Sequence, residues 1–101
     1  MNQEVYLLDG KVNVTLKGEF FLDQSTWIRD ELFPYVEKGF SQFIFDFTDV
    51  EAIDSSGIGV LIAIQKKAKG IGGGVVINGM HGNVRKTFEL AELNKVFIIH
   101  F

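Results

Sequence analysis

A strand pattern that gives way to a helix pattern in the middle of the chain is the feature that most restricts the fold. Residues 41–47 read Ser-Gln-Phe-Ile-Phe-Asp-Phe and place three phenylalanines on one side of an extended chain, which is typical of an interior β-strand. Residues 58–64 are apolar almost all round and lead into a lysine-rich stretch, as in a helix that is buried at its start and solvated at its end. The strand pattern and the helix pattern together predict an α/β fold in which this helix packs on a sheet.

The rest of the chain repeats these two patterns. Residues 11–17 alternate in polarity, as in a half-buried strand, and residues 4–8 are expected to be its hairpin partner. The two segments are joined by Asp9-Gly10, a dipeptide that supplies the positive φ angles of a tight hairpin turn. Further helices are expected over residues 24–38 and 83–93, and further strands over residues 74–78 and 96–101. The order ββαβαβαβ predicts a mixed sheet of about five strands, with right-handed crossovers between the later, parallel strands and helices mainly on one face.

The ends of two helices carry recognisable signals. For the helix over residues 24–38, Asp23 or Ser25 is expected to cap the start. Pro34 lies inside the pattern and removes one backbone hydrogen bond, so we expect a kink or an early end there. For the apolar helix, Asp54 before its start and three lysines near its end match the charge preference of the helix dipole, with Gly70 as the C-terminal cap.

Length and charge exclude several classes of protein. The chain has 101 residues, which predicts one domain over residues 1–101. Ten Lys and Arg against 13 Asp and Glu give a net charge of −3, so we expect no nucleic-acid partner. No stretch approaches the roughly 20 apolar residues of a membrane span, and the first residues have no secretory signal pattern, so a cytoplasmic protein is expected. The absence of Cys excludes disulfides and thiolate metal sites.

The most informative segment lies between the central strand and the apolar helix. Residues 49–62 read Asp-Val-Glu-Ala-Ile-Asp-Ser-Ser-Gly-Ile-Gly-Val-Leu-Ile, an expected acidic loop that enters the helix through two hydroxyls and two glycines. In open parallel sheets, ligands and partners bind at the carboxyl ends of strands, where helix N-termini point. A structural explanation fits the spacing equally well: one of residues 54–56 caps the helix, and Gly57 and Gly59 allow close packing on the sheet. Both explanations can hold together.

These residues resemble the STAS domain of bacterial anti-sigma factor antagonists. The signature of that family is an aspartate-containing loop, an Asp-Ser-Ser-Gly or Asp-Ser-Thr-Gly run and an apolar helix. Here the signature reads Asp54-Ser55-Ser56-Gly57-Ile58-Gly59-Val60-Leu61.

The resemblance extends over nearly the whole chain. Residues 18–19 with Asp23 resemble the family's Gly-Glu-Leu-Asp approach to the first helix, although two more residues separate the glycine from the aspartate than is usual in the family. Residues 72–73 resemble the glycine pair before the next strand, and residues 84–88 resemble the third helix. The resemblance implies a STAS-type fold over residues 1–101, with the family's usual C-terminal helix absent.

The resemblance also implies a regulatory function without chemistry of its own. Ser55 is expected to be phosphorylated by a partner that is both an anti-sigma factor and a serine kinase of the GHKL type, with a serine phosphatase opposing it. The unphosphorylated protein is expected to bind that kinase and free the sigma factor. Ser56 is the rival phosphoacceptor, which sequence physics alone does not separate from Ser55. The expected partner-binding residues are Phe21, Asp23, Asp49, Asp54, Ser55, Ser56, Gly57 and Ile58.

The charges around Ser55 suit such a switch. A phosphate adds about 1.5 to 2 negative charges and three acceptor oxygens, which the N–H groups of a helix start can receive without unfolding. The phosphate stands beside Asp54, with Asp49 and Glu51 nearby, so a surface fitted to a partner becomes more negative. Breaking a close polar contact at the centre of an interface costs about 2 to 5 kcal/mol, or about 30-fold or more in affinity.

Two other classes of function fit parts of the sequence. A module of similar fold could serve as a scaffold in a stressosome-like assembly or as a subunit of a transport complex. A small hydrolase would need His81 within hydrogen-bond reach of a serine, but the serines do not form the Gly-x-Ser-x-Gly elbow. His100 is expected in a strand, and His81 with the scattered acids shows no metal-ligand spacing. We therefore expect no catalytic residue, no metal site and no cofactor.

Two short segments have competing explanations. Residues 70–74 are glycine-rich but lie between a helix and a strand, the reverse of the order in a phosphate-binding loop, so a turn is expected. The apolar triplet Phe20-Phe21-Leu22 is explained by core packing, or by one or two exposed contacts with a partner.

Overall fold

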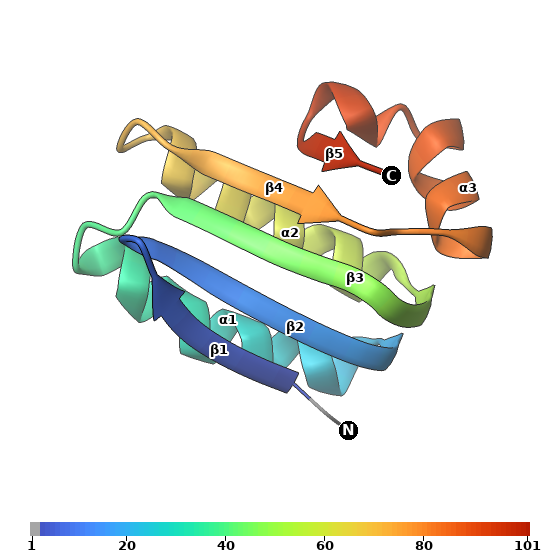
Figure 1. Cartoon of the computed structure of the whole chain (residues 1–101), viewed down its shortest axis with the longest axis horizontal. Helices are drawn as coiled ribbons and strands as arrows, with labels where there is room; N and C mark the ends of the chain where they lie inside the picture. Colours follow the sequence, from blue (N-terminus) through green and yellow to red (C-terminus); the bar gives the residue numbers. More distant parts are fainter. Residues whose placement is uncertain (1–2) are drawn as a thin grey trace.

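The computed structural model describes residues 3–101 and contains a five-stranded sheet (Figure 1). The strands lie side by side in chain order. The first strand runs antiparallel to the second, and the remaining neighbours are parallel. The strands are β1 (Gln3–Leu8), β2 (Lys11–Phe20), β3 (Gln42–Ile53), β4 (Gly74–Asn78) and β5 (Ile98–His100).

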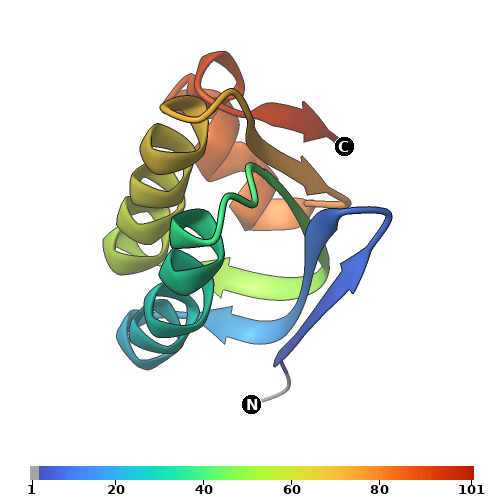
Figure 2. The same cartoon turned by 90° about the vertical axis from the view of Figure 1, so that its left-hand side faces the viewer.

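Helices connect the parallel strands and lie on one side of the sheet (Figure 2). Helix α1 spans Leu22–Glu37, α2 spans Ser55–Lys69, α3 spans Gly82–Leu90, and a short 3₁₀ helix η1 spans Leu93–Lys95. Among the described residues, no helix covers the opposite face. The predicted α/β fold class and the order ββαβαβαβ are confirmed.

The core lies between the sheet and helices α1 and α2. The alternation predicted from the sequence is confirmed, because every second residue from Val12 to Leu16 in β2 and in the first half of β3 points under the helices and is buried. Fully burying an aliphatic or phenyl side chain contributes about 1.5 to 3 kcal/mol. The fully buried residues include Val12, Val14, Phe43, Phe45, Phe47, Ile28, Leu32, Leu61, Ile64 and Ile77.

A chain of aromatic contacts attaches α3 to this core. The Phe47 ring on β3 lies 6.1 Å from the Phe20 ring and 6.3 Å from the Phe88 ring, both edge to face. Phe88 on α3 in turn lies 6.3 Å from Phe97, which precedes β5. These contacts therefore tie the end of β2 and the C-terminal segment to the central strand.

The prediction of an acidic loop after the central strand is wrong. Strand β3 continues through residues 48–53 and pairs with β2 as far as Phe20 and Ile53. The cause is that β2 also continues beyond Gly18 to Phe20, so the backbone groups of β3 find partners there. Asp49 and Glu51 are therefore strand residues, and both are exposed.

Helix α1 begins with a cap that differs from those expected, and it does not end early. It begins at Leu22, with Phe21 rather than Asp23 or Ser25 in the N-cap position, and the Gln24 side chain accepts a hydrogen bond of 3.0 Å from the Phe21 N–H. Ser25 Oγ instead donates to the Phe21 carbonyl. The helix continues past Pro34 to Glu37, so the expected early end is wrong.

The C-terminal elements are shorter than predicted. Helix α3 ends at Leu90, and Glu92 has a left-handed backbone with φ of 55°, which an α-helix does not accommodate. The N–H groups of Val96 and Phe97 both bond to the Leu93 carbonyl in the turn that follows. Strand β5 therefore begins only at Ile98 and pairs with β4 over three residues.

Candidate functional site

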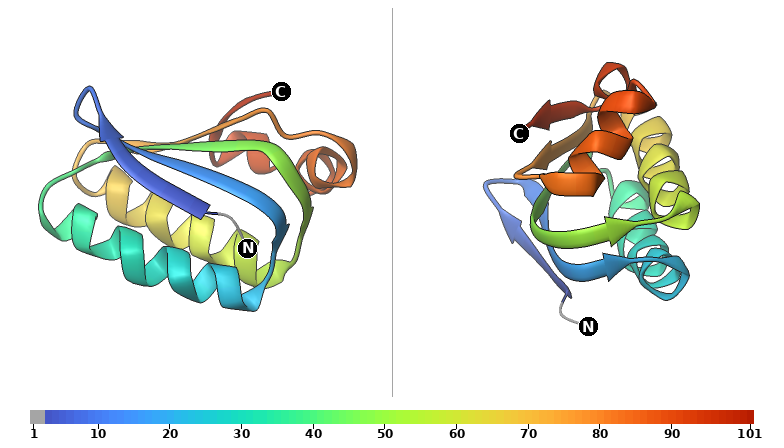
Figure 3. Two further views of the ribbon diagram at one scale, coloured as in Figure 1. Left: turned by 60° about the horizontal axis from the view of Figure 1, so that its bottom comes forward. Right: turned by 90° about the vertical axis from the view of Figure 1, so that its right-hand side faces the viewer.

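The parallel arrangement brings the starts of α1 and α2 to one end of the molecule (Figure 3). Helix α1 follows the carboxyl end of β2, and α2 follows the carboxyl end of β3. The two helices also pack against each other. Residues of the Asp-Ser-Ser-Gly run thus lie beside the first turn of α1, at the carboxyl ends of the parallel strands, where α/β folds place their binding sites.

Strand β3 bends as it approaches this end. Between the pairs Thr15↔Asp46 and Lys17↔Asp49, β2 advances by two residues and β3 by three. Between Gly18↔Val50 and Glu19↔Ala52, β2 advances by one residue and β3 by two. Such extra residues bend a strand and redirect its side chains, and bulges of this kind are frequent beside functional sites.

Asp54 caps helix α2. Its backbone is extended, and its Oδ1 accepts a hydrogen bond of 3.1 Å from the Gly57 N–H. The Asp54 N–H itself bonds to the Phe20 carbonyl at the end of β2. Within residues 3–101, the N–H groups of Ser55 and Ser56 have no hydrogen-bond acceptor. The helix start therefore retains two backbone donors, and the helix dipole adds partial positive charge there.

The two glycines of the motif have different environments. A Cβ added to Gly57 would lie 2.7 Å from the Phe20 carbonyl oxygen and 2.7 Å from Ile53 Cγ1. The first turn of α2 thus approaches the sheet so closely that only glycine fits, as expected from the sequence. A Cβ added to Gly59 would meet no atom within 4 Å. The expectation that Gly59 serves close packing on the sheet is therefore wrong.

The two hydroxyl residues are exposed to different degrees. Ser55, the first residue of α2, is exposed. Ser56 is half-buried and lines a groove of about 290 Å³ between α1 and α2, together with Leu22, Arg29 and Gly59. The structure thus distinguishes two serines that the sequence could not.

Exposed carboxylates lie on the first turn of α1 and on the last part of β3, the strand that leads into α2. Asp23 on the first turn of α1 is exposed, as are Asp49 and Glu51 on β3. Asp49 is paired in register with Lys17 of β2. Among residues 3–101, none of these three carboxylates has a Lys, Arg or His nitrogen within 4 Å. Negative charge therefore remains available to a partner at this end of the molecule.

The apolar residues at this end are exposed to different degrees. Phe21 is half-buried in the N-cap position of α1, whereas Leu22 beside it is 63% exposed. Ile58 is half-buried and packs against the core. Arg29 was not among the residues expected to contact a partner, although it lines the α1–α2 groove together with Leu22 of the predicted apolar triplet. Leu22 and Arg29 are seven residues apart and therefore lie on one stripe of the helix, a spacing that the sequence already shows.

In the described part of the chain, His81 and the serines do not have the geometry that a small hydrolase would need. His81 Nε2 lies 2.7 Å from the Thr48 carbonyl oxygen and so donates its hydrogen to the backbone. Within residues 3–101, no serine hydroxyl is hydrogen-bonded to a histidine. The same part of the chain contains no cluster of three or more His, Asp or Glu residues able to hold a metal ion. Nor do the described helices include one with the length and apolarity to cross a bilayer.

The family of this chain is shown by a match over almost the full sequence. A family model described as the STAS domain covers residues 2–101. The chain belongs to the STAS domain family.

Relatives of this STAS domain include anti-sigma factor antagonists. The anti-sigma-B factor antagonist of Bacillus subtilis is 25% identical over 99 residues, which is 98% of this chain and 90% of the relative. A Thermotoga neapolitana protein with the provisional name anti-sigma factor antagonist TM1081 homologue is 27% identical over 74 residues, or 73% of this chain. That match spans 63% of the length of the Thermotoga relative.

Solved structures support the fold of this STAS domain. The crystal structure of TM1081 from Thermotoga maritima superposes with a TM-score of 0.90 at 22% identity, covering 98% of this chain and 86% of that one. Bacillus SpoIIAA in its phosphorylated form superposes with a TM-score of 0.81 at 19% identity, covering 99% and 92%.

Proposed function

We propose that this STAS domain is a cytoplasmic anti-sigma factor antagonist whose binding to an anti-sigma serine kinase is switched off by phosphorylation of Ser55. The observation that carries the proposal is the position of one hydroxyl. Ser55 is exposed at the start of α2, next to two backbone N–H groups without an acceptor. Ser56 is half-buried in the α1–α2 groove, where a kinase reaches it less easily.

A phosphate on Ser55 is compatible with the fold. Its oxygens can accept hydrogen bonds from the free N–H groups of Ser55 and Ser56, and the helix dipole favours negative charge at this end. The Asp54 cap uses the Gly57 N–H instead, so the phosphate and the cap do not compete for one donor. The modification is therefore expected to change the surface and leave the core intact.

The same phosphate is expected to disrupt an interface. The partner would contact a surface that contains exposed Leu22 for apolar burial and the carboxylates of Asp23, Asp49 and Glu51 for pairing with basic groups. Phosphorylation adds about 1.5 to 2 negative charges at the centre of this surface. A closely packed partner would have to remove water from these charges, which is unfavourable. A loss of about 2 to 5 kcal/mol, or about 30-fold or more in affinity, is expected. An opposing serine phosphatase would restore binding.

The test is capture of partners from extract of the native cell, followed by measurement of affinity. Bait carrying Ser55→Ala is expected to retain a GHKL-type kinase, and bait carrying Ser55→Asp is expected to bind it about 30-fold or more weakly. Incubation with ATP should yield phosphate on Ser55 by mass spectrometry, and Ser56→Ala is the matched control that keeps this phosphorylation.

Other outcomes would contradict the proposal. Equal affinity of the Ser55→Ala and Ser55→Asp variants for the kinase would show that the hydroxyl is not the switch. Phosphate on Ser56 in the unmodified protein would assign the switch to the groove. Recovery of transport subunits alone, without any kinase, would favour a scaffold or transport role.

A further inference from the structure

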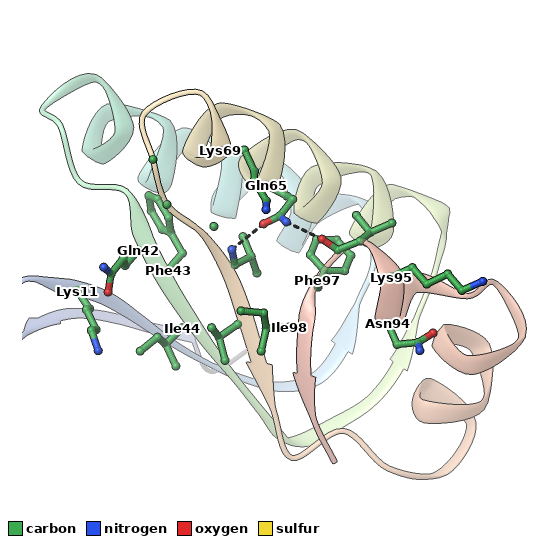
Figure 4. A pocket seen from close by; sticks show the side chains of 16 residues that line it. Lys11, Gln42, Phe43, Ile44, Gln65, Lys69, Asn94, Lys95, Phe97 and Ile98 are labelled. Atoms are coloured by element: carbon green, nitrogen blue, oxygen red, sulfur yellow. Dashed lines mark hydrogen bonds between the residues drawn. The ribbon is translucent and has the colours of Figure 1, made fainter.

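A second cavity lies at the opposite end of α2 from Ser55 (Figure 4). Helix α2 has 15 residues, so its two ends are on the order of 20 Å apart at 1.5 Å per residue. The cavity has a volume of about 520 Å³, within the range of small-molecule sites of roughly 300 to 1,000 Å³. It is thus separate from the surface assigned to the kinase.

The cavity exists because β5 is short. Strand β5 pairs with β4 only from Val76 to Asn78, and the amino end of β4 has no neighbouring strand on that side. Gln65 of α2 bridges part of the gap: its Oε1 accepts a hydrogen bond of 2.6 Å from the Val75 N–H, and its Nε2 donates to the Val96 carbonyl. These bonds hold the two walls in place, so the cavity is preformed.

The floor of the cavity is apolar. Ile44, Val76 and Ile98 are register partners on three neighbouring strands and lie on the sheet face that carries no helix. Ile98 is 60% exposed, and Ile44 and Val76 are half-buried. Phe97 also lines the cavity. This floor offers a flat hydrophobic contact to a ring or an alkyl chain.

The charges that line the cavity have one sign. Lys11, Lys69 and Lys95 line it, whereas no acidic residue does so among the described residues. This contrasts with the whole chain, in which 13 acidic residues outnumber 10 basic ones. Lys95 has a carboxylate of Glu92 at 3.4 Å. Within residues 3–101, Lys11 and Lys69 have no carboxylate within 4 Å, so their ammonium groups are available to an anion.

The glycine-rich turn beside the cavity does not act as a phosphate loop. The N–H groups of Gly72, Gly73 and Gly74 bond to the carbonyls of Lys69, Ala68 and Ser41. An anion in the cavity must therefore be held by side chains, not by a cradle of backbone donors. The sequence-based interpretation of residues 70–74 as a turn is confirmed.

We propose that this cavity binds a small amphiphilic anion, with an aromatic or aliphatic body on Ile44, Val76 and Ile98 and an anionic head paired with Lys11, which lies on the same face of the sheet (Figure 4). The occupant is identified by charge complementarity and by the apolar floor. Side-chain ammonium groups pair with carboxylate, sulfonate or phosphate alike, so the head group is defined by its charge. The proposal does not depend on the kinase switch.

The test is a titration of the ¹⁵N-labelled protein with 1-naphthalenesulfonate, followed by NMR. We expect saturable shifts confined to the amides of the lining residues 11, 42–44, 72–76 and 94–98. The uncharged 1-naphthalenemethanol, which has the same ring system, is expected to bind about 10-fold more weakly, a difference of about 1.4 kcal/mol. Lys11→Gln should weaken binding of the sulfonate by a similar factor.

Matched controls separate charge at the site from charge in general. Lys66→Gln removes an exposed lysine of α2 that does not line the cavity, and it should leave the affinity unchanged. Ile98→Glu places an acid on the exposed floor and should abolish binding, and Ser55→Asp should have no effect. Equal binding of both naphthalenes, equal effects of Lys66→Gln and Lys11→Gln, shifts centred elsewhere, or no saturation would each overturn the proposal.

Discussion

The two glycines of the signature provide a sharp test of how α2 meets the sheet. Both can be replaced by alanine, and they lie two residues apart in one helix. At Gly57 the new methyl group would lie 2.7 Å from a backbone oxygen of Phe20 and 2.7 Å from the Ile53 side chain. At Gly59 the same methyl group would meet no atom within 4 Å. The same Gly→Ala substitution is therefore expected to have opposite effects on stability at these two positions.

The magnitudes follow from packing and helix propensity. Alanine is more favourable than glycine in a helix by up to about 1 kcal/mol, and this gain is expected at Gly59→Ala without any opposing clash. Inserting a methyl group into a closely packed site costs about 1 to 3 kcal/mol, and at Gly57 a backbone carbonyl cannot rotate away as a side chain can. Gly57→Ala is thus expected to lower the free energy of unfolding by about 0.5 to 2 kcal/mol after the propensity gain.

Thermal and urea unfolding measure the difference. For a domain of this size, 1 kcal/mol corresponds to about 4 to 8 °C in Tm. Gly59→Ala is expected to raise Tm by a few degrees and Gly57→Ala to lower it, with equal m-values in urea for both variants. Two stabilised variants would refute the close approach of α2 to the end of β2. Two destabilised variants would refute the open space around Gly59.

Two further predictions concern hydrogen bonds that position α2 and the C-terminal segment. Asp54→Ala removes the side-chain acceptor for the Gly57 N–H and should cost about 1 kcal/mol by urea unfolding, whereas Asp54→Asn, which keeps an oxygen, should cost less. Gln65→Leu removes both partners of the bridge between Val75 and Val96 and should cost about 1 to 3 kcal/mol, with faster hydrogen exchange at the Val75 amide. Unchanged exchange at that amide would contradict the bridge.

Much of the fold can be predicted from the sequence because the core requires regular alternation. The phenylalanines of β3 recur at every second position, and the apolar run of α2 leads directly into a lysine-rich stretch, as in a helix that is buried at its start and solvated at its end. Those patterns report burial directly, since each face of an element meets either the core or solvent. The hairpin turn at Asp9-Gly10 depends on local backbone preferences alone, and both residues do have positive φ.

The ends of elements were predicted less well, because they depend on distant partners. Residues 48–53 contain two exposed acids and read as a loop, yet they form a strand because β2 extends alongside them. Phe21 replaces the polar caps expected for α1 because the Gln24 side chain supplies the hydrogen bond. In both cases a backbone group found a partner that local sequence does not reveal.

The candidate site likewise combines features set by local sequence with features set by distant neighbours. The sequence determined that an aspartate, two hydroxyls and a glycine enter a buried helix, because capping and helix packing act over a few residues. Only the tertiary structure decided that Ser55 is exposed while Ser56 is half-buried in a groove, and that Leu22 rather than Phe21 is presented to solvent. Exposure is set by the helices and strands that fold against a residue, and those neighbours are far away in the chain.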